Sequence, residues 1–351
     1  MPLVKGNSDI HHMWNPFVYT LTDYIYSLNC NVEFSFNAEL FTTNEIFSFD
    51  IIHIMWPSIF SFMGNSTNFR HRLTEIKKHG GRIITTCHNL VPHYCDDDDI
   101  KAFYNIAFGE SDLIIHLGQY SKVMFEEMYP TIKHVIIPHH VYDTLYTDLE
   151  KSKNSKRKYI SCIGTFRNQE EKDLLKCAGK SLLFSRYYFL VPSLLVVQWN
   201  RRNKLALLWT ILKRCWLKTR CHIITLNKEW INHEELQRCM KCSDITFIQR
   251  KENLNSGNLT LGFLYGNVVV GPNTGNIGRI LHDTGNPIFD PDKSNSIVKA
   301  IRKSIQMQKE GKGKENQTYA LCHWTTRYAA ESHYSVYKSL MNNTSISQSS
   351  I

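Results

Sequence analysis

Ten short, continuous apolar runs, separated by longer amphipathic stretches, are the feature that most limits what this chain can fold into. They lie at residues 50–57, 81–87, 112–118, 134–140, 158–164, 187–191, 221–226, 244–249, 267–272 and 287–291. Such runs, bounded by turn residues, are typical of strands buried on both faces of a parallel sheet. Between them, "FRHRLTEIKKHG" and "YSKVMFEEMYP" are helix-like, the first closed by Gly80 and the second by Pro130. The alternation predicts an α/β protein.

The chain has room for two such domains. Its 351 residues suffice for about two domains of ordinary size. The pattern of strands and helices restarts after the basic stretch "KSKNSKRK", which places a boundary near residues 145–158. Hydrophobic residues make up 42% and charged residues 21% of the chain, a composition typical of globular proteins. We expect an N-terminal domain at 1–148, a C-terminal domain at 158–322 and a frayed tail at 343–351.

The net charge of +9 suggests anionic partners. The basic residues concentrate in "KSKNSKRK" (151–158) and, between residues 201 and 220, in "RRNK" and "KRCWLKTR". A nucleotide, a nucleic acid or lipid headgroups would match this charge, whereas a solvated linker and a solvated helix face are the alternative. Nucleic acid is the least favoured partner, because aromatic residues are not interleaved with the basic clusters in a stacking pattern.

Cysteine usage and hydropathy suggest a cytoplasmic protein. The ten cysteines are scattered singly, apart from Cys239 and Cys242, and no second pair completes a four-thiolate zinc site. We interpret them as reduced, largely buried thiols. The first residues lack the pattern of a signal peptide. The most apolar run, 187–197, is too short to span a bilayer and is broken by Pro192, so association with a membrane would be peripheral.

A first candidate site follows the strand at 81–87, in the segment "CHNLVPH". Ligands of open α/β sheets bind where strands end at their carboxyl edge, and His88 and His93 lie at such an edge. Polar groups there could grip and polarise a ligand in a cleft between two domains. The alternative is that both histidines only cap the carbonyl groups at the end of the strand.

A second candidate site lies in "NLNSGNLTLGFLYGNVVVGPNTGNIGRIL", residues 253–281. Asn255 or Ser256 can cap a helix there, and Gly257 leaves the first amides of that helix open to a phosphate. The strand "VVVGP" feeds a second small-residue turn into a helix, at Thr274 and Gly275. Two helix N-termini at one sheet edge make a site for a diphosphate.

A third strand-to-turn junction, "CIGTFRN", adds a basic side chain. Arg167 of this segment could pair with phosphate oxygens. Each turn is weak evidence by itself, but three of them follow strands of the same predicted sheet. Together they indicate an anion-binding edge in the second domain.

The order of these segments resembles the bacterial glycosyltransferases of family four, which have the GT-B fold. The segments that carry the resemblance are "NPF", "DIIHIMWP", "TCHNLVPH", "SDLIIHLGQYS", "HVIIPHHVY", "IGTFRN", "SDITFIQ", "NSGNLTLGFLYGNVVVGPNTGNIGRIL" and "HWTTRYAAESHYSVYKSL". The resemblance implies two Rossmann-like domains facing across a cleft. It also implies a nucleotide-sugar donor held by the C-terminal domain, an acceptor held by the N-terminal domain, and a last helix, 323–342, that crosses back.

The family's site residues can be carried over in part. The histidine at a strand end corresponds to His88, which would touch the donor sugar near its anomeric carbon, and the basic residue of the first C-terminal loop corresponds to Arg167. Glu170 occupies the place expected for the family's lysine, so Lys172 is the substitute. We expect Asn15 of "NPF" and His93 on the acceptor side.

One departure concerns the family's two glutamates, separated by seven residues. The corresponding positions hold Asn253 and Leu261, and a leucine cannot accept a hydrogen bond from a ribose hydroxyl. The "NSG" variant resembles a subset of bacterial polysaccharide-assembly transferases. The change is therefore interpreted as a trait of that subset.

These observations predict a hexosyltransferase. It would move a sugar from a nucleoside diphosphate donor to a hydroxyl of a growing, lipid-linked glycan in surface polysaccharide synthesis, at the inner face of the plasma membrane. Arg167 and helix amides would stabilise the departing diphosphate, so neither metal nor cofactor is expected. The resemblance implies retention of anomeric configuration.

Two alternatives stay open. A nucleotide-sugar epimerase of the same fold would need further acids in its cleft, and "CDDDD" is the only acidic run. A non-catalytic homologue would explain the missing glutamates. Donor hydrolysis without acceptor would distinguish these possibilities.

Overall fold

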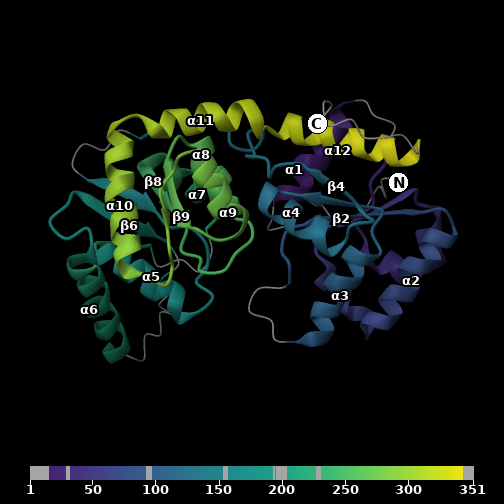
Figure 1. Cartoon of the computed structure of the whole chain (residues 1–351). Helices are drawn as coiled ribbons and strands as arrows, with labels where there is room; N and C mark the ends of the chain where they lie inside the picture. The colour runs from purple at the N-terminus through teal and green to yellow at the C-terminus, as the bar shows by residue number, and fades with distance from the viewer. Residues whose placement is uncertain are drawn as a thin grey trace. The chain divides into compact units, whose positions relative to one another are not determined.

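The computed structural model describes residues 16–28, 32–91, 97–152, 157–192, 194, 204–226 and 231–342. The chain divides into two compact units. Unit 1 comprises Met1–Leu145 and Trp324–Ile351, and unit 2 comprises Tyr146–His323. Each unit contains one parallel sheet flanked by helices (Figure 1).

Unit 1 is built on a four-stranded sheet in the order β1-β2-β3-β4. All three pairings are parallel, with Ile52 opposite Ile83 and Thr86 opposite Ile115. Its elements are α1 (Pro16–Ser27), η2 (Ala38–Thr42), η3 (Asn44–Ser48), β1 (Ile51–Ile54), η4 (Pro57–Met63), α2 (Ser66–Lys78), β2 (Arg82–Cys87), α3 (Asp98–Gly109), β3 (Leu113–His116), α4 (Gln119–Met128), β4 (Lys133–Ile136) and α12 (Thr326–Met341). Late in the sequence, α12 packs against α1 and so belongs to this unit.

Unit 2 is built on a six-stranded sheet in the order β10-β9-β8-β5-β6-β7. Its elements are β5 (Lys158–Ser161), α5 (Gln169–Lys180), β6 (Tyr187–Val191), α6 (Lys204–Arg220), β7 (Ile223–Thr225), α7 (His233–Cys242), β8 (Ser243–Phe247), α8 (Gly257–Leu264), β9 (Val268–Pro272), α9 (Gly275–Asp283), β10 (Ile288–Phe289), α10 (Ser294–Lys309) and α11 (Lys312–His323). All pairings are parallel, and the chain order reverses between β5 and β8. This is the doubly wound order, in which ligands bind beside the point of reversal.

Each of the ten apolar runs of the sequence coincides with one strand of the described chain to within one residue at its start, or contains it, so the α/β prediction is confirmed. The central strands are covered on both faces: every residue of β3 and β9 is buried. A continuous run of β-branched residues therefore predicted a central strand, because burial removes the apolar side chains on both faces of such a strand from water.

The cysteines fit the expectation only in part. Among the described residues all eight are free thiols, four of them buried, whereas Cys215 and Cys322 are exposed. Burial raises the pKa of the Cys87 and Cys162 thiols far above its ordinary range, so both stay protonated and unreactive at neutral pH.

Candidate functional site

Three loops meet the carboxyl edge of the unit 2 sheet at its point of reversal. They follow β5, β8 and β9, and they contain residues 162–168, 248–256 and 273–274. β5 and β8 are neighbours in the sheet, with Ile160 opposite Ile245. The edge thus gathers all three segments that the sequence indicated as anion-binding turns.

The loop after β5 is shaped by Gly164, whose φ of +101° lies in the left-handed region. A Cβ added there would lie 3.3 Å from Nη2 of Arg250. A side chain at this position would therefore meet both backbone strain and a crowded guanidinium. Because residue 164 is a glycine, the backbone of this loop can pass close to the Arg250 guanidinium.

A buried ion pair holds this loop in place. Arg250 follows β8 and is 8% exposed, and its Nη1 donates hydrogen bonds to the Thr165 carbonyl (3.0 Å) and to Oε2 of Glu171 (2.6 Å). Glu171 is fully buried and also accepts the backbone N–H of Arg167 at 2.9 Å. Removing either charge would leave the other buried without its partner.

The two cations predicted to bind phosphate, Arg167 and Lys172, lie on either side of Glu171 in the sequence. Arg167 is exposed and precedes Asn168, the N-cap of α5. Lys172 lies in the first turn of α5 and is half-buried. The Glu171–Arg250 pair therefore fixes the backbone that carries Arg167 and Lys172. The sequence alone did not predict this role for the pair. The only signal was a polar pair, "QR", ending the buried run "ITFI".

The N-termini of α8 and α9 lie side by side at this edge. Asn276 of α9 donates from its amide side chain to Oδ1 of Asn255 at 2.9 Å, and from its backbone N–H to the Leu254 carbonyl at 2.9 Å. The side chain of the N-cap residue Ser256 makes no capping hydrogen bond, and the hydroxyl of Thr274 donates to the Lys251 carbonyl instead of capping α9. Ser256, one of the two residues expected to cap this helix, therefore occupies the N-cap position without a side-chain cap, and the side chain of Asn255 instead accepts from Asn276.

Glycine permits this close approach. Gly275 has a φ of +57°, and a Cβ added to it would lie 2.6 Å from the Asn253 carbonyl oxygen. The predicted pair Thr274–Gly275 and the predicted turn at residues 255–257 thus lie against one another. Two helix N-termini without side-chain caps, side by side, present their first amides and their positive dipole ends to the same edge.

Two buried amide oxygens at the edge have no hydrogen-bond partner within the described residues. They are Oε1 of Gln249 and Oδ1 of Asn253. A buried acceptor without a donor is costly and is satisfied when a ligand supplies a hydroxyl or an N–H. Of the two positions at which the resemblance led us to expect glutamates, Asn253 lies at this edge, whereas Leu261 is buried inside α8 at 6% exposure.

In unit 1, His88 directly follows β2 and its ring is packed between aromatic side chains. The ring of Trp56 stacks on it at 5.0 Å, and the ring of Phe17 meets it edge-on at 4.6 Å. His88 is only 9% exposed. Burial, with smaller contributions from the charges of His139 and His333, lowers the pKa of His88 to about 3. The imidazole is therefore neutral at physiological pH and can donate or accept a hydrogen bond without carrying charge.

His88 belongs to a group of five histidines, three buried and two half-buried, which we call the histidine cluster. Its members are His53, His88, His139, His140 and His333. Burial is the largest cause that lowers the pKa of each one. They come from the segments "DIIHIMWP", "TCHNLVPH", "HVIIPHHVY" and "HWTTRYAAESHYSVYKSL", so four of the segments that carry the family resemblance meet here.

Hydrogen bonds fix the other members of the histidine cluster. His53 bonds with the hydroxyls of Tyr337 (2.9 Å) and Thr86 (2.8 Å), one through each ring nitrogen. The Thr20 hydroxyl lies 2.8 Å from Nε2 of His140. Because a hydroxyl can donate or accept, each of these contacts is compatible with a neutral imidazole in either tautomer.

Several predictions fall elsewhere. Asn15 and His93 lie outside the described residues. The described part of "CDDDD" is the exposed start of α3, where Asp97 caps the helix by accepting the N–H of Asp99 at 2.9 Å. That run is a helix terminus, which accounts for its acids without a catalytic role.

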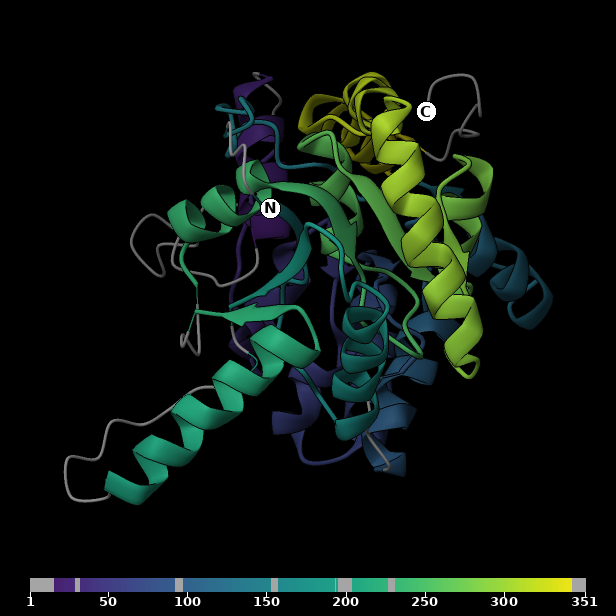
Figure 2. The ribbon, with the colours of Figure 1, turned by 90° about the vertical axis from the view of Figure 1, so that its left-hand side faces the viewer.

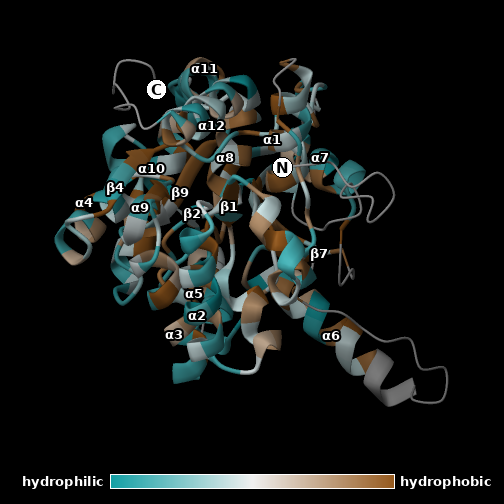
Figure 3. Cartoon of the chain, turned by 90° about the vertical axis from the view of Figure 1, so that its right-hand side faces the viewer, coloured by the Kyte–Doolittle hydropathy of each residue, from teal (hydrophilic) through white to brown (hydrophobic). Residues whose placement is uncertain are grey.

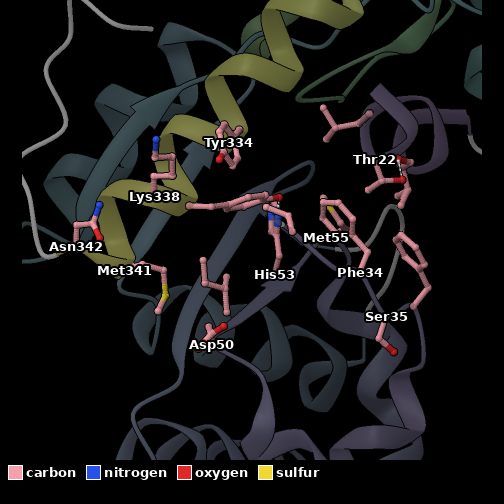
Figure 4. Close-up of a pocket in the computed structure, with 16 residues that line it drawn as sticks. Thr22, Phe34, Ser35, Asp50, His53, Met55, Tyr334, Lys338, Met341 and Asn342 are labelled. Atoms are coloured by element: carbon pink, nitrogen blue, oxygen red, sulfur yellow. Dashed lines mark hydrogen bonds between the residues drawn. The ribbon is translucent and has the colours of Figure 1, made fainter. Parts of the chain in front are cut away.

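Unit 1 also contains a cavity of about 300 Å³ (Figure 4). Side chains from α1, residues 32–36, β1 and α12 line it, and most are apolar, such as Leu21, Phe34 and Met55. His53 lies in its wall and Lys338 of α12 lines it as well. Such a cavity suits an apolar ligand with a polar or anionic end.

Two further findings concern the described residues alone. None of their His, Cys, Asp and Glu side chains form a group of three or more able to hold a metal ion. None of the helices they form has the length and apolar character needed to cross a membrane.

No protein-family description and no curated protein sequence matches this chain. Solved structures do match it. HepE from Anabaena, in complex with UDP, has a TM-score of 0.61 and 11% identity, over 86% of this chain and 81% of HepE. Sucrose-phosphate synthase from Thermosynechococcus elongatus has a TM-score of 0.60 and 12% identity, over 90% and 82% of the two chains.

A third match is to a protein from Listeria monocytogenes named as a UDP-N-acetylglucosamine 2-epimerase. Its TM-score is 0.54 and its identity 10%, over 98% of this chain and 83% of that one. Together these likenesses show that the chain has the GT-B fold, with two Rossmann-like domains. At such identities they show the fold alone.

Proposed function

We propose that this protein is a glycosyltransferase that takes a sugar from a nucleoside diphosphate donor. The observation that carries the proposal is the unit 2 edge, where the N-termini of α8 and α9 are tied together by Asn255 and Asn276. Paired helix N-termini suit the two charges of a diphosphate. The binding of UDP and of UDP-glucose by HepE, which has the same fold, supports this assignment.

In the transfer step the acceptor hydroxyl oxygen forms the new bond to the anomeric carbon, and its proton passes to the departing phosphate oxygen. As the bond between the anomeric carbon and the diphosphate breaks, its electron pair moves to the phosphate oxygen and negative charge builds on the diphosphate. Arg167 and the amides of Ser256, Gly257 and Gly275 would stabilise that charge, with Lys172 beside them. The buried oxygens of Gln249 and Asn253 would accept hydroxyl hydrogens of the donor.

In unit 1, we assign His88 to the transferred sugar. A neutral imidazole can hydrogen-bond a sugar hydroxyl, and it places no positive charge near an anomeric centre that becomes cationic in the transition state. We further propose that unit 1 serves as the acceptor domain and unit 2 as the donor domain, with Asn15 and His93 near the acceptor.

The finer assignment is a retaining, metal-independent hexosyltransferase acting on a lipid-linked glycan in surface polysaccharide synthesis. It would work in the cytoplasm, at the inner face of the plasma membrane. The cavity of unit 1 supports a lipid-linked acceptor, because its mostly apolar lining suits part of a hydrocarbon chain and Lys338 suits an anionic group attached to such a chain.

An epimerase of the same fold is the second candidate, because the Listeria protein named as such an enzyme shares the fold. The two functions differ in product. Thermal shift with UDP-, GDP- and ADP-sugars would first identify the base, since a ligand that binds only the folded state raises its melting temperature. NMR of the donor then distinguishes transfer, hydrolysis and inversion of a sugar carbon.

The direct test of the donor site is Arg167→Ala. Loss of a charge-assisted contact should weaken nucleoside diphosphate binding by about 1.5–3 kcal/mol in calorimetry. Arg302→Ala, at an exposed arginine of α10, is the matched control and should bind normally. Unchanged affinity in a folded Arg167→Ala protein would remove Arg167 from the site.

A further inference from the structure

Helix α6 of unit 2 leaves one apolar face exposed among the described residues. The side that packs on unit 2 is marked by Leu217, which is 2% exposed. On the other sides Trp209 is 70% exposed and Trp216 is 47% exposed. Figure 2 shows α6 extending away from the other elements of its unit. Most of the basic residues described in α6 are exposed, as expected for a solvated helix face, but the helix also exposes an apolar face that the sequence analysis did not predict.

The exposed apolar residues form one continuous surface, which we call the α6 face. At 3.6 residues per turn, positions three, four and seven apart share a side, so Leu208 and Leu212 are neighbours and Trp209 lies one heptad before Trp216. Figure 3 shows hydrophobic residues along this helix where it leaves the unit. The members of the α6 face are Leu208, Trp209, Ile211, Leu212, Cys215 and Trp216.

Basic residues border the α6 face on both sides. Lys213 and Arg220 lie next to the two tryptophans, and Lys218 lies next to Ile211 on the opposite border. Residues 204–220 contain five lysines or arginines and no acid. An apolar face with tryptophans, framed by cations, is the pattern of a helix that lies in the plane of a membrane interface.

We propose that α6 binds the surface of an anionic lipid bilayer, with the α6 face buried at the boundary between headgroups and acyl chains. The bordering lysines and arginine then contact anionic headgroups. Charge decides between a bilayer and a second copy of this chain, because a second α6 would bring five more cations against the first. The inference deepens the proposed location at the inner face of the plasma membrane, on which it rests, by naming the surface that binds the bilayer, and the binding itself needs neither donor nor acceptor.

The experiment is flotation of the full chain with large vesicles. One set contains about 30% phosphatidylglycerol in phosphatidylcholine and the other contains phosphatidylcholine alone. The chain should float with the anionic set. Trp209→Ser with Trp216→Ser should weaken this binding at least tenfold, while Leu183→Ser with Phe184→Ser, at two other exposed apolar residues of unit 2, should leave it unchanged.

The charge contribution is tested separately. Lys213→Gln, Lys218→Gln and Arg220→Gln together should weaken binding to anionic vesicles by about a hundredfold at low salt. The matched control removes the same number of charges from α10, at the exposed residues Lys299, Arg302 and Lys303. It should weaken vesicle binding much less. High salt should weaken binding only in part, because the apolar contribution is not screened.

Three outcomes would overturn the proposal. They are failure of the chain to float with anionic vesicles, normal flotation of the folded tryptophan variant, and equal losses in the α6 and α10 charge variants. Sedimentation velocity without lipid completes the test. A concentration-dependent dimer that the tryptophan variant abolishes, with no vesicle binding, would make α6 an interface between copies. Because flotation needs no nucleotide, failure here is distinct from failure of the proposed transfer.

Discussion

The histidine cluster should make unit 1 sensitive to mild acid. Burial lowers the pKa of His333 to about 4, whereas an unfolded histidine titrates near 6.5. Between these two values the unfolded chain binds a proton that the folded chain does not bind. The free energy of unfolding therefore falls as the pH falls through this window, and the contribution is complete below the folded pKa.

The size of the effect follows from the same numbers. Each pH unit in the window corresponds to about 1.4 kcal/mol per histidine, so at pH 5 each buried neutral histidine reduces stability by about 2 kcal/mol relative to pH 7.5. His88, His139 and His333 together give about 6 kcal/mol. That is comparable with the whole stability of an ordinary domain.

The test variant is His333→Asn, which removes one titrating group. In the wild-type chain Nδ1 of His333 lies 2.8 Å from the Ala329 carbonyl oxygen, and the asparagine keeps a side-chain donor near that oxygen. The variant will be less stable at pH 7.5, because a buried ring is lost. The measured quantity is the difference in unfolding free energy between pH 7.5 and pH 5, and this difference should shrink by about 2 kcal/mol.

Urea titrations followed by circular dichroism give the free energies, and hydrogen exchange of peptides from β2 and β3 assigns the change to unit 1. His71→Asn is the matched control, because His71 is exposed on α2 of the same unit. If His333→Asn and His71→Asn change the pH difference by the same amount, the cluster is not the source of the acid sensitivity.

Three other predictions concern the two candidate sites. Arg250→Met should lower the unfolding free energy by about 3–5 kcal/mol, because Glu171 is left as an uncompensated buried charge; a thermal melt unchanged from wild type would contradict the ion pair. Gly275→Ala should destabilise by more than about 1 kcal/mol and weaken nucleotide binding, measured by urea titration and calorimetry, whereas retained binding would show that the α8–α9 approach is not needed. His88→Ala should lower turnover while leaving nucleotide affinity almost intact, and near-normal turnover in a folded variant would make His88 a strand-end residue only.

The sequence was sufficient for the strands and for the positions of the turns. The run "RIITTC" could be identified from its own residues, because a short, continuous run of β-branched residues is typical of a parallel strand that is buried on both faces. The turns at Ser256–Gly257 and at Thr274–Gly275 were likewise visible, since small residues between a strand and a helix have a local cause.

Pairings between side chains that are distant in the sequence could be identified only from the tertiary structure. Glu171 and Arg250 lie 79 residues apart, and nothing local in either segment indicates the other. The histidine cluster gathers residues 53, 88, 139, 140 and 333 because three strand ends and α12 meet there, and burial by that meeting sets their pKa values. The α6 face was decided in the same way. The sequence shows an apolar helix bordered by lysines and arginines, but only its packing through Leu217 determines which apolar side chains stay in contact with water.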